Sequence, residues 1–527
     1  RDVERSRGLG DVYKRQTFGL CGGPWGGASR KAGQLLWKEV RCLGWYLSGA
    51  LDWGDGGISL CGRCTDMIVL KDVSFQYEGC EEGVHGIDLT VCDGECVVLT
   101  GPSGGGKTTL TRLLNGLAPS YYQGTKKGDL WINYTEIASL PAWKIGQEIG
   151  SVFQDPKSQF FSSELAGEVA FACENYGMAK QEIRKRTDEA IASMGLETLR
   201  ARPLDVLSSG EKQRVAVASV YALRPHTYVC DEPTANLDSE GATRLAGILR
   251  KLKDEGNTLI IAEHRLAWLS GIADRFVYVS EGTIQWEKTP AQMRELSEEE
   301  RKRYGLREVT ETEASLPGVP ANAGEEHFFC RNLTCRRKKL LIFENLNLSL
   351  PAGKITALTG RNGAGKTTLA MVLAGLQKQS GGEIYIGGKK LPAGKRRKVV
   401  WYSSNDTGTQ FFTTSVTEEL LLHSDASSGR LEHARTLLKT LGLYAYKDTH
   451  PAALSGGQKQ RLSIACGLLS GREILLFDEP TSGLDGGNMR KIAAVLTVAA
   501  AEGKTIGVIT HDKELMQACC DFRWKLG

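Results

Sequence analysis

The stretch Gly101-Pro-Ser-Gly-Gly-Gly-Lys-Thr-Thr109 decides the fold of this 527-residue chain. It follows an apolar run, Cys96-Val-Val-Leu-Thr100, and precedes a stretch with helical periodicity at residues 110–117. Glycines at these positions allow backbone N–H groups to surround phosphate oxygens, and the N-terminus of the next helix adds a favourable dipole. The order of strand, G-x-x-x-x-G-K-T loop and helix therefore predicts a phosphate-binding P-loop.

The motifs of the first half recur in the second half. The P-loop returns as Gly360-Arg-Asn-Gly-Ala-Gly-Lys-Thr-Thr368, again between an apolar run and a helical pattern. Leu207-Ser-Ser-Gly-Glu-Lys-Gln-Arg214 returns as Leu454-Ser-Gly-Gly-Gln-Lys-Gln-Arg461. A period of about 250 residues is far longer than a solenoid repeat, so it indicates a duplication that produced two homologous domains.

The repeat predicts the fold class and the domain boundaries. We expect two tandem α/β P-loop NTPase domains, at residues 67–294 and 327–527. Each should have a core of mostly parallel strands, a small antiparallel sheet and a helical subdomain, with the helical inserts near residues 160–206 and 411–453. Residues 295–326 have the charged, proline-containing composition of a linker.

Composition excludes several classes of protein. With 41% hydrophobic and 24% charged residues, the chain reads as a globular protein, not a collagen or a long disordered chain. It has no run of about 18 apolar residues, so no transmembrane helix is predicted. A net charge of +4 does not by itself indicate nucleic-acid binding.

The first 66 residues differ from the rest of the chain. They keep no strand or helix pattern, and we expect them to be a leader outside the two domains, either disordered or translated from upstream of the true start. They contain Cys61-Gly-Arg-Cys64, but no second ligand pair follows at zinc-site spacing, which argues against a metal there.

Two short apolar runs end in paired carboxylates, Asp231-Glu232 and Asp478-Glu479. In a parallel sheet such strand ends face the ligand crevice. The first carboxylate of each pair suits the coordination shell of Mg²⁺, and the second is placed to orient or deprotonate a water that attacks the γ-phosphate. A lone Asp-Glu pair is usually a solvated turn, but here the pair recurs downstream of a P-loop both times.

Two histidines follow apolar runs at matching places in the two halves. His264 lies 33 residues after Asp231, and His511 lies 33 residues after Asp478. A single histidine is most often a surface or core residue. The shared spacing and the position at a strand end favour contact with the γ-phosphate instead.

These motifs together resemble the nucleotide-binding domains of the ATP-binding cassette (ABC) family, over about residues 67–527. Leu454-Ser-Gly-Gly-Gln458 resembles the family signature, and Leu207-Ser-Ser-Gly-Glu211 is a mild variant of it. The resemblance implies that two ATP molecules lie between the halves, each held by one P-loop and the opposite signature. It also implies that the D-loops, Ala235-Asn-Leu-Asp238 and Ser482-Gly-Leu-Asp485, cross that interface, and that Gln154 in the Q-loop touches Mg²⁺.

The motifs and the resemblance predict three groups of site residues and two ligands, ATP and Mg²⁺. The expected catalytic residues are Glu232, His264, Glu479 and His511. The expected metal-binding residues are Thr108, Gln154, Asp231, Thr367 and Asp478. The expected nucleotide-binding residues are Tyr77, where the family stacks a ring on adenine, the P-loop residues Gly101, Pro102, Ser103, Gly104, Gly105, Gly106, Lys107, Thr108, Thr109, Gly360, Arg361, Asn362, Gly363, Ala364, Gly365, Lys366, Thr367 and Thr368, and the signature residues Ser208, Gly210, Glu211, Ser455, Gly457 and Gln458.

Within the family, three types of protein compete. Gln154-Asp-Pro-Lys-Ser-Gln159 resembles the Q-loop run of energy-coupling-factor (ECF) transporter ATPases, which implies an importer of a vitamin, a vitamin precursor or a metal ion. The partners would be integral membrane transport subunits, and the chain would sit on the cytoplasmic face of the membrane. A soluble tandem-ABC translation factor is an alternative, but its linker is longer and more charged. A fused sugar-importer ATPase is a second alternative, disfavoured by the intact second P-loop.

Two further expectations concern the membrane partner and the balance between the sites. Exposed Phe160, Phe161, Phe411 and Phe412 are expected to line a groove that receives helices of the membrane subunit. The site built on Lys366 is expected to be the slower one, because it pairs with the variant signature. When the two halves of the sequence are aligned, Asn405 also takes the place of Gln154, and Arg337 takes the place of Tyr77.

Overall fold

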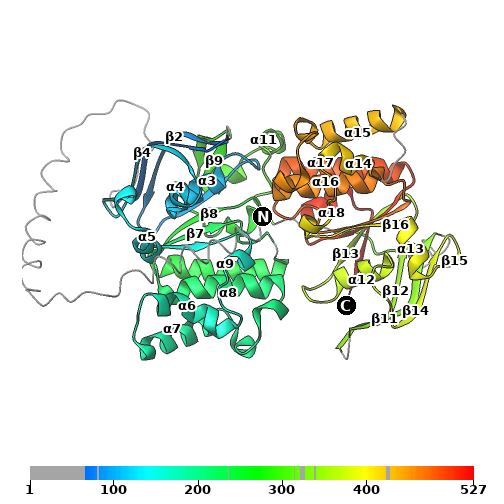
Figure 1. Cartoon of the computed structure of the whole chain (residues 1–527), viewed down its shortest axis with the longest axis horizontal. Helices are drawn as coiled ribbons and strands as arrows, with labels where there is room; N and C mark the ends of the chain where they lie inside the picture. The colour runs from blue at the N-terminus through cyan, green and yellow to red at the C-terminus, as the bar shows by residue number, and fades with distance from the viewer. Residues whose placement is uncertain are drawn as a thin grey trace, which may run out of the picture. The chain divides into compact units, whose positions relative to one another are not determined.

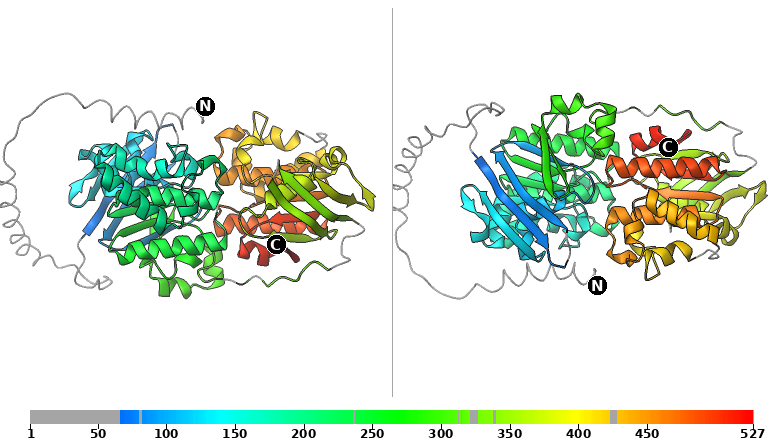
Figure 2. Two further views of the ribbon diagram at one scale, coloured as in Figure 1. Left: turned by 90° about the horizontal axis from the view of Figure 1, so that it is seen from below. Right: turned by 90° about the horizontal axis from the view of Figure 1, so that it is seen from above.

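The computed structural model describes residues 66–526, except 80, 81, 236, 312, 314, 321–326, 338, 339 and 423–427. Residues 66–526 form one compact unit, and the expected leader lies almost wholly outside the described residues. Each domain is built from one continuous half of the chain, blue to green and yellow to red in Figures 1 and 2.

The central sheet of the first domain has the strand order β10-β9-β3-β8-β7-β6. All neighbouring strands are parallel except the β9–β10 hairpin. A second, antiparallel sheet has the order β2-β1-β4-β5. The strands of the first domain are β1 (Asp66–Tyr77), β2 (Gly83–Cys92), β3 (Cys96–Thr100), β4 (Gly124–Ile132), β5 (Thr135–Glu136), β6 (Ile149–Val152), β7 (Thr227–Asp231), β8 (Thr258–Ala262), β9 (Arg275–Ser280) and β10 (Thr283–Lys288).

The second domain repeats this plan. Its central sheet, β16-β17-β18-β13-β19, is parallel throughout, and its antiparallel sheet has the order β12-β11-β14-β15. The strands are β11 (Phe328–Arg337), β12 (Leu340–Leu350), β13 (Ile355–Thr359), β14 (Gly381–Ile386), β15 (Lys389–Lys390), β16 (Val400–Ser403), β17 (Ile474–Asp478), β18 (Thr505–Ile509) and β19 (Phe522–Lys525).

Helices complete both domains (Figure 1). Those of the first domain and the connecting segment are α3 (Lys107–Leu114), α4 (Leu117–Ser120), α5 (Ala142–Glu148), α6 (Leu165–Asn175), α7 (Lys180–Ser193), α8 (Ser209–Leu223), α9 (Ser239–Asp254), α10 (Pro290–Arg294) and α11 (Glu298–Arg303). Those of the second domain are α12 (Lys366–Leu373), α13 (Ala393–Val399), α14 (Val416–Leu421), α15 (Ser428–Thr440), α16 (Gly456–Leu469), α17 (Gly486–Ala501) and α18 (Lys513–Cys519).

Alternating side chains of the central strands feed two cores in each domain. In β3, Cys96 and Val98 pack into the core on the helical side, whereas Val97 and Leu99 pack into the core under the antiparallel sheet. This alternation follows from the two-residue period of a strand that is buried on both faces. Strand β17 does the same in the second domain. The predicted fold class is confirmed, including both helical inserts.

The segment between the domains is ordered where the structure describes it. Leu306 and Val309 are buried in the core of the first domain. Arg307, between them, is 1% exposed and contacts residues of the second domain. Across the described residues, no helix is long and apolar enough to span a membrane.

Candidate functional site

The two P-loops lie at corresponding places, between β3 and α3 and between β13 and α12. Lys107 Nζ donates hydrogen bonds to the carbonyls of Gly101 (3.0 Å) and Pro102 (2.8 Å). Lys366 Nζ donates to Gly360 (2.7 Å) and Arg361 (3.0 Å) in the same way. Each lysine is thus held over its own loop, where an incoming phosphate would meet it.

Glycine is required at the start of the first P-loop. Gly101 has a φ of +138°, and a Cβ there would lie 2.0 Å from the carbonyl oxygen of Val279. The close approach of this backbone to β9 leaves no space for a side chain. The loop shape that the sequence motif predicts is therefore fixed by packing against the sheet.

Each P-loop threonine contacts the first carboxylate of the acidic pair. Thr108 Oγ1 donates to Asp231 Oδ1 (3.3 Å), and Thr367 Oγ1 donates to Asp478 Oδ2 (2.7 Å). Burial, together with the charge of Glu232, raises the pKa of Asp231 to about 7, although Thr108 opposes the shift. Burial also raises the pKa of Asp478. A bound cation would favour the ionised form of both groups.

This donor set fits Mg²⁺. A threonine hydroxyl beside one carboxylate supplies the hard oxygen ligands that Mg²⁺ prefers, with substrate phosphates and waters filling the other positions. Among the described residues there is no group of three or more His, Cys, Asp or Glu side chains that could cage a metal ion. The arrangement thus suits a cation that arrives with a nucleotide.

The second carboxylate of each pair sits on strained backbone. Glu232 and Glu479 have φ values of +45° and +49°, a region that costs a non-glycine residue of order 1–3 kcal/mol and is concentrated at functional sites. Their amides donate to the carbonyls of Ala262 (2.8 Å) and Ile509 (2.9 Å) on the neighbouring strand. The backbone of both residues is therefore held by the same contact at the end of a central strand.

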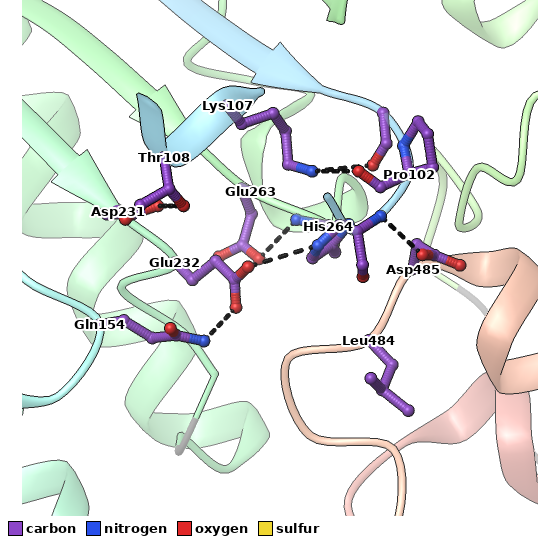
Figure 3. A network of polar contacts seen from close by, with 12 residues as sticks. Pro102, Lys107, Thr108, Gln154, Asp231, Glu232, Glu263, His264, Leu484 and Asp485 are labelled. Carbon is purple, nitrogen blue, oxygen red and sulfur yellow. Dashed lines mark hydrogen bonds and ion pairs between the residues drawn. The ribbon is translucent and has the colours of Figure 1, made fainter. Parts of the chain in front are cut away.

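In the first domain, Glu232 bridges two predicted site residues (Figure 3). Its Oε2 accepts a hydrogen bond from Gln154 Nε2 at 2.6 Å, and its Oε1 lies 3.3 Å from His264 Nε2. The Q-loop, the acidic pair and the histidine thus meet at one carboxylate. The structure brings together the residues predicted to handle the attacking water.

The matching contacts in the second domain are looser. His511 Nε2 lies 3.8 Å from Glu479 Oε1, and Asn405 lines the adjacent cavity in place of a glutamine. Burial raises the pKa of Glu479 to about 7, opposed by the charges of Arg265 and Lys366. Burial and the charge of Lys366 lower the pKa of His511 to about 4, so this imidazole is neutral at neutral pH.

The two D-loops make reciprocal contacts with the opposite P-loops. Ser103 N–H donates to Asp485 Oδ2 (2.8 Å), and Asn362 N–H donates to Asp238 Oδ2 (2.9 Å). Burial would raise the pKa of Asp485, but the amides of Asn488 and Ser103 and the nearby His264 lower it to about 2. The P-loop of each domain is therefore held by an ionised aspartate of the other.

A cavity of about 340 Å³ lies between the second P-loop and the first signature. Residues from both domains line it. Its lining comprises Ser208, Ser209, Ala235, Leu237 and Arg265 of the first domain, and Ile342, Asn362, Gly363, Gly365, Lys366, Thr367, Thr368, Asn405, Asp478, Glu479, Ser482 and His511 of the second. The structure thus places Ser208 at the site of Lys366.

Both signatures form capping boxes at the start of their helices. Ser208 caps α8 and Ser455 caps α16. Glu211 Oε2 accepts hydrogen bonds from the Ser208 amide and hydroxyl (2.8 Å each), and Gln458 Oε1 accepts from the Ser455 amide (2.8 Å). The variant Glu211 therefore keeps the local geometry and directs its charge to its own cap.

Tyr77, the predicted adenine contact, lies beside the first P-loop. Its hydroxyl is 3.2 Å from Thr109 Oγ1 and accepts a hydrogen bond from Arg112 (2.9 Å). Tyr77 is the last residue of β1, and Arg337 is the last residue of the corresponding strand β11. Arg337 therefore occupies the strand position in the second domain that Tyr77 occupies in the first, as expected.

The phenylalanines predicted to line a docking groove divide into two pairs. Phe161 and Phe412 are 39% and 80% exposed. Phe160 and Phe411 are less exposed than expected: they are partly buried and pack against the hydrophobic cores. Buried carboxylates fix the turns that carry these phenylalanines. Glu168 accepts a hydrogen bond from the amide of Phe161 at 2.8 Å, and Glu419 accepts one from the amide of Phe412 at 2.9 Å.

Sequence reasoning missed Tyr402. Its hydroxyl donates to Asp478 Oδ2 (3.2 Å), the oxygen that also accepts from Thr367. The matching residue of the first domain is Ser151, because Ser151 and Tyr402 occupy the same place in β6 and β16. An alignment of the two halves could have revealed it, because the residue three positions before Gln154 and Asn405 is a serine in the first half and a tyrosine in the second.

Comparisons with known proteins agree with this geometry. The profile of the ABC transporter family matches residues 84–235 and 343–482. A Treponema denticola protein whose name describes it as an ABC transporter ATP-binding protein is 37% identical over 462 residues, covering 86% of this chain and 94% of that protein. A Bacillus subtilis protein named for ATP binding in HMP/thiamine import is 31% identical, covering 86% and 89%.

Among solved structures, a ribosome-bound archaeal complex of Pelota and ABCE1 matches with a TM-score of 0.61. The sequence identity is 22%, and the match covers 86% of this chain and 76% of that one. At this identity the likeness concerns the fold alone.

Proposed function

The chain belongs to the ABC transporter family, and from this premise we propose that it energises an ECF-type importer of a vitamin, a vitamin precursor or a metal ion. It is an ATP-binding subunit with ATPase activity, the activity of its family. The observation that carries the finer proposal is the Q-loop run Gln154–Gln159, together with a relative named for HMP/thiamine import. The proposed location is the cytoplasmic face of the membrane, beside integral transport subunits.

Two composite ATP sites form between the domains in this proposal. The D-loop contacts of Asp485 with Ser103 and of Asp238 with Asn362 support the pairing. The cavity between Lys366 and Ser208 supports it independently. The first site would join Lys107 to the signature at Ser455, and the second would join Lys366 to the signature at Ser208.

The residues of each site divide the work of hydrolysis. Lys107 and Lys366 would release their own loop carbonyls and contact the β- and γ-phosphates. Thr108, Thr367 and the carboxylates of Asp231 and Asp478 would hold Mg²⁺ there, with Gln154 reaching it in the first site. That ion supplies positive charge to the phosphate oxygens as charge develops.

The second carboxylate of each acidic pair would act on the attacking water. Glu232, held between Gln154 and His264, would orient the water and accept its proton. His264 would then contact the γ-phosphate from the strand end. Glu479 and His511 would have the same roles in the second site, where His511 Nε2 lies 3.8 Å from Glu479 Oε1.

Reconstitution with membrane partners tests the importer proposal. The chain is expressed with the membrane-protein genes beside its own, and thiamine, thiamine-precursor and divalent-metal uptake are measured in proteoliposomes loaded with ATP. ATP-dependent uptake that the Lys107→Ala, Lys366→Ala double variant abolishes is the expected result. Co-purification with ribosomes in place of membrane subunits, without uptake of any tested solute, would contradict the proposal.

A further inference from the structure

We propose that Arg265 of the first domain is a further nucleotide-binding and positioning residue of the composite site built on Lys366. Its guanidinium would reach across the domain interface toward the triphosphate and Glu479. This inference rests on the proposed ATP site between the two domains. No motif in the sequence pointed to Arg265, because it follows a histidine that belongs to the other site.

The turn that carries Arg265 is fixed by a buried carboxylate. Glu263 follows β8 and is 2% exposed. Its Oε1 accepts hydrogen bonds from the amides of His264 (2.8 Å) and Arg265 (3.1 Å), and its Oε2 accepts from the Thr234 hydroxyl (2.5 Å). Both residues therefore project from a rigid turn.

Neighbouring side chains of this turn serve different sites. His264 lies 3.3 Å from Glu232 in its own domain. Arg265 lines the cavity that holds Lys366, Glu479 and His511 of the second domain. One short turn therefore presents its histidine to the first site and its arginine to the second.

Arg265 adds positive charge where the nucleotide would place negative charge. Glu479 faces Lys366, Asp478, His511 and Arg265. A planar guanidinium in this cavity is well suited to bind the phosphate oxygens of a nucleotide held by Lys366.

The equivalent position in the second domain carries the opposite charge. Asp512 follows His511, but its carboxylate is turned away from the first site by buried partners. It lies 2.8 Å from Arg307 Nη1 and accepts a hydrogen bond from the Thr481 hydroxyl at 2.6 Å. The first site therefore receives no cation from this position of the second domain.

This asymmetry explains how the second site can work despite its changes. Asn405 is shorter than Gln154, and Glu211 replaces a neutral glutamine in the paired signature. The shorter Asn405 reaches less far toward a bound metal ion, whereas the negative charge of Glu211 is held at its own helix cap. Arg265, supplied by the opposite domain, would instead strengthen the binding of the phosphates.

Single-site variants allow a test on the complete chain with its membrane partner. Glu232→Gln leaves the second site to work, and Glu479→Gln leaves the first. In the Glu232→Gln chain, Arg265→Gln is expected to raise the KM for ATP about tenfold, the size of one hydrogen bond to a charged group. Arg265→Lys, which keeps a positive charge that can bind phosphate, should recover part of the lost affinity.

A comparison between the two sites separates this role from a structural one. A mere disturbance of the turn would strike the first site hardest, because His264 works there. The proposal predicts instead that Arg265→Gln lowers the ratio of second-site to first-site kcat/KM about tenfold. Arg200→Gln, which removes an exposed positive charge of the helical subdomain, is the matched control and should leave the ratio unchanged. Equal losses at both sites, or no loss at the second, would overturn the proposal.

A binding measurement decides the matter even if the second site does not hydrolyse ATP. The Lys107→Ala chain is titrated calorimetrically with Mg²⁺ and a non-hydrolysable ATP analogue, with and without Arg265→Gln. An affinity about tenfold weaker supports the inference. Unchanged affinity refutes it while leaving the proposed site in place, whereas an absence of binding in both chains refutes the site and the inference with it.

Discussion

Replacing Arg307 with methionine should unfold the second domain at a markedly lower temperature. Arg307 comes from the segment between the domains, yet it is 1% exposed. Its Nη1 lies 2.8 Å from Asp512 Oδ2, and its Nε and Nη2 donate to the carbonyls of Leu484 (3.1 Å) and Thr481 (3.4 Å). Methionine would fill much of the volume but supply none of these contacts.

The size of the effect follows from what the substitution leaves behind. Removing one partner of a buried ion pair costs about 3–5 kcal/mol, because the other charge stays buried without compensation. For a domain of this size, that corresponds to a fall of roughly 6–20 °C in Tm. Much of the cost should disappear in the double variant Arg307→Met, Asp512→Asn, which removes the uncompensated charge and keeps a side chain that can accept from Thr481.

Thermal unfolding of the full chain in ligand-free buffer, followed by circular dichroism, provides the measurement. Lys302→Met is the matched control from the same segment: its ion pair with Glu298 is exposed, and such pairs contribute little to stability. A Tm shift for Arg307→Met no larger than that of the control would refute the reasoning, as would a double variant less stable than Arg307→Met alone.

Three further predictions concern activity and assembly. Glu232→Gln should remove nearly all ATP turnover, a general base being worth 10²–10⁴-fold, while Glu479→Gln should leave a measurable remainder; equal losses in the assembled transporter would contradict unequal sites. In the Glu232→Gln chain, kcat/KM should rise with pH through about 7. Burial raises the pKa of Glu479 to about 7, and only its ionised form accepts a proton. A flat profile between pH 6 and 8 would count against this. Phe161→Ser with Phe412→Ser should detach the chain from membranes without loss of ATP binding, as a flotation assay and nucleotide titration would reveal; continued attachment would exclude docking there.

Motifs whose function depends on local sequence were visible before the structure. The P-loops require glycines at set spacing, and the acidic pairs and histidines follow buried strands, so composition and order alone located them. The helical inserts followed from apolar residues at helical spacing. These features are encoded within a few turns or strands of the chain.

Features that depend on long-range packing were not visible. Residues 295–326 have the composition of a linker, yet Leu306 and Val309 are buried in the first domain while Arg307 is buried against the second. Three residues are too few to form a periodic signal, and a buried arginine is recognisable only from its partner, Asp512, some two hundred residues away. The partial burial of Phe160 and Phe411 was not visible either, because it depends on core residues that are distant in the sequence.

Residues of the second domain's D-loop lie beside both of the proposed sites. Ser482 lines the second cavity, whereas a Cβ on Gly483 would lie 3.0 Å from Glu232 Oε2 and 3.2 Å from Gln154 Nε2. Asp485, two residues on, holds the amide of Ser103. Three neighbouring residues thus touch both sites.

Arg307 anchors this loop at both ends of the Ser482–Gly483 pair. Arg307 binds the carbonyls of Thr481 and Leu484, at either side of Ser482 and Gly483, and so fixes the loop to the segment that joins the domains. When nucleotide at the second site moves Ser482, Gly483 must move against Glu232 or Arg307 must release its carbonyls. Any coupling between the two proposed sites would then act on Glu232, the proposed general base of the first site, and loosening the loop through Arg307→Met should weaken it.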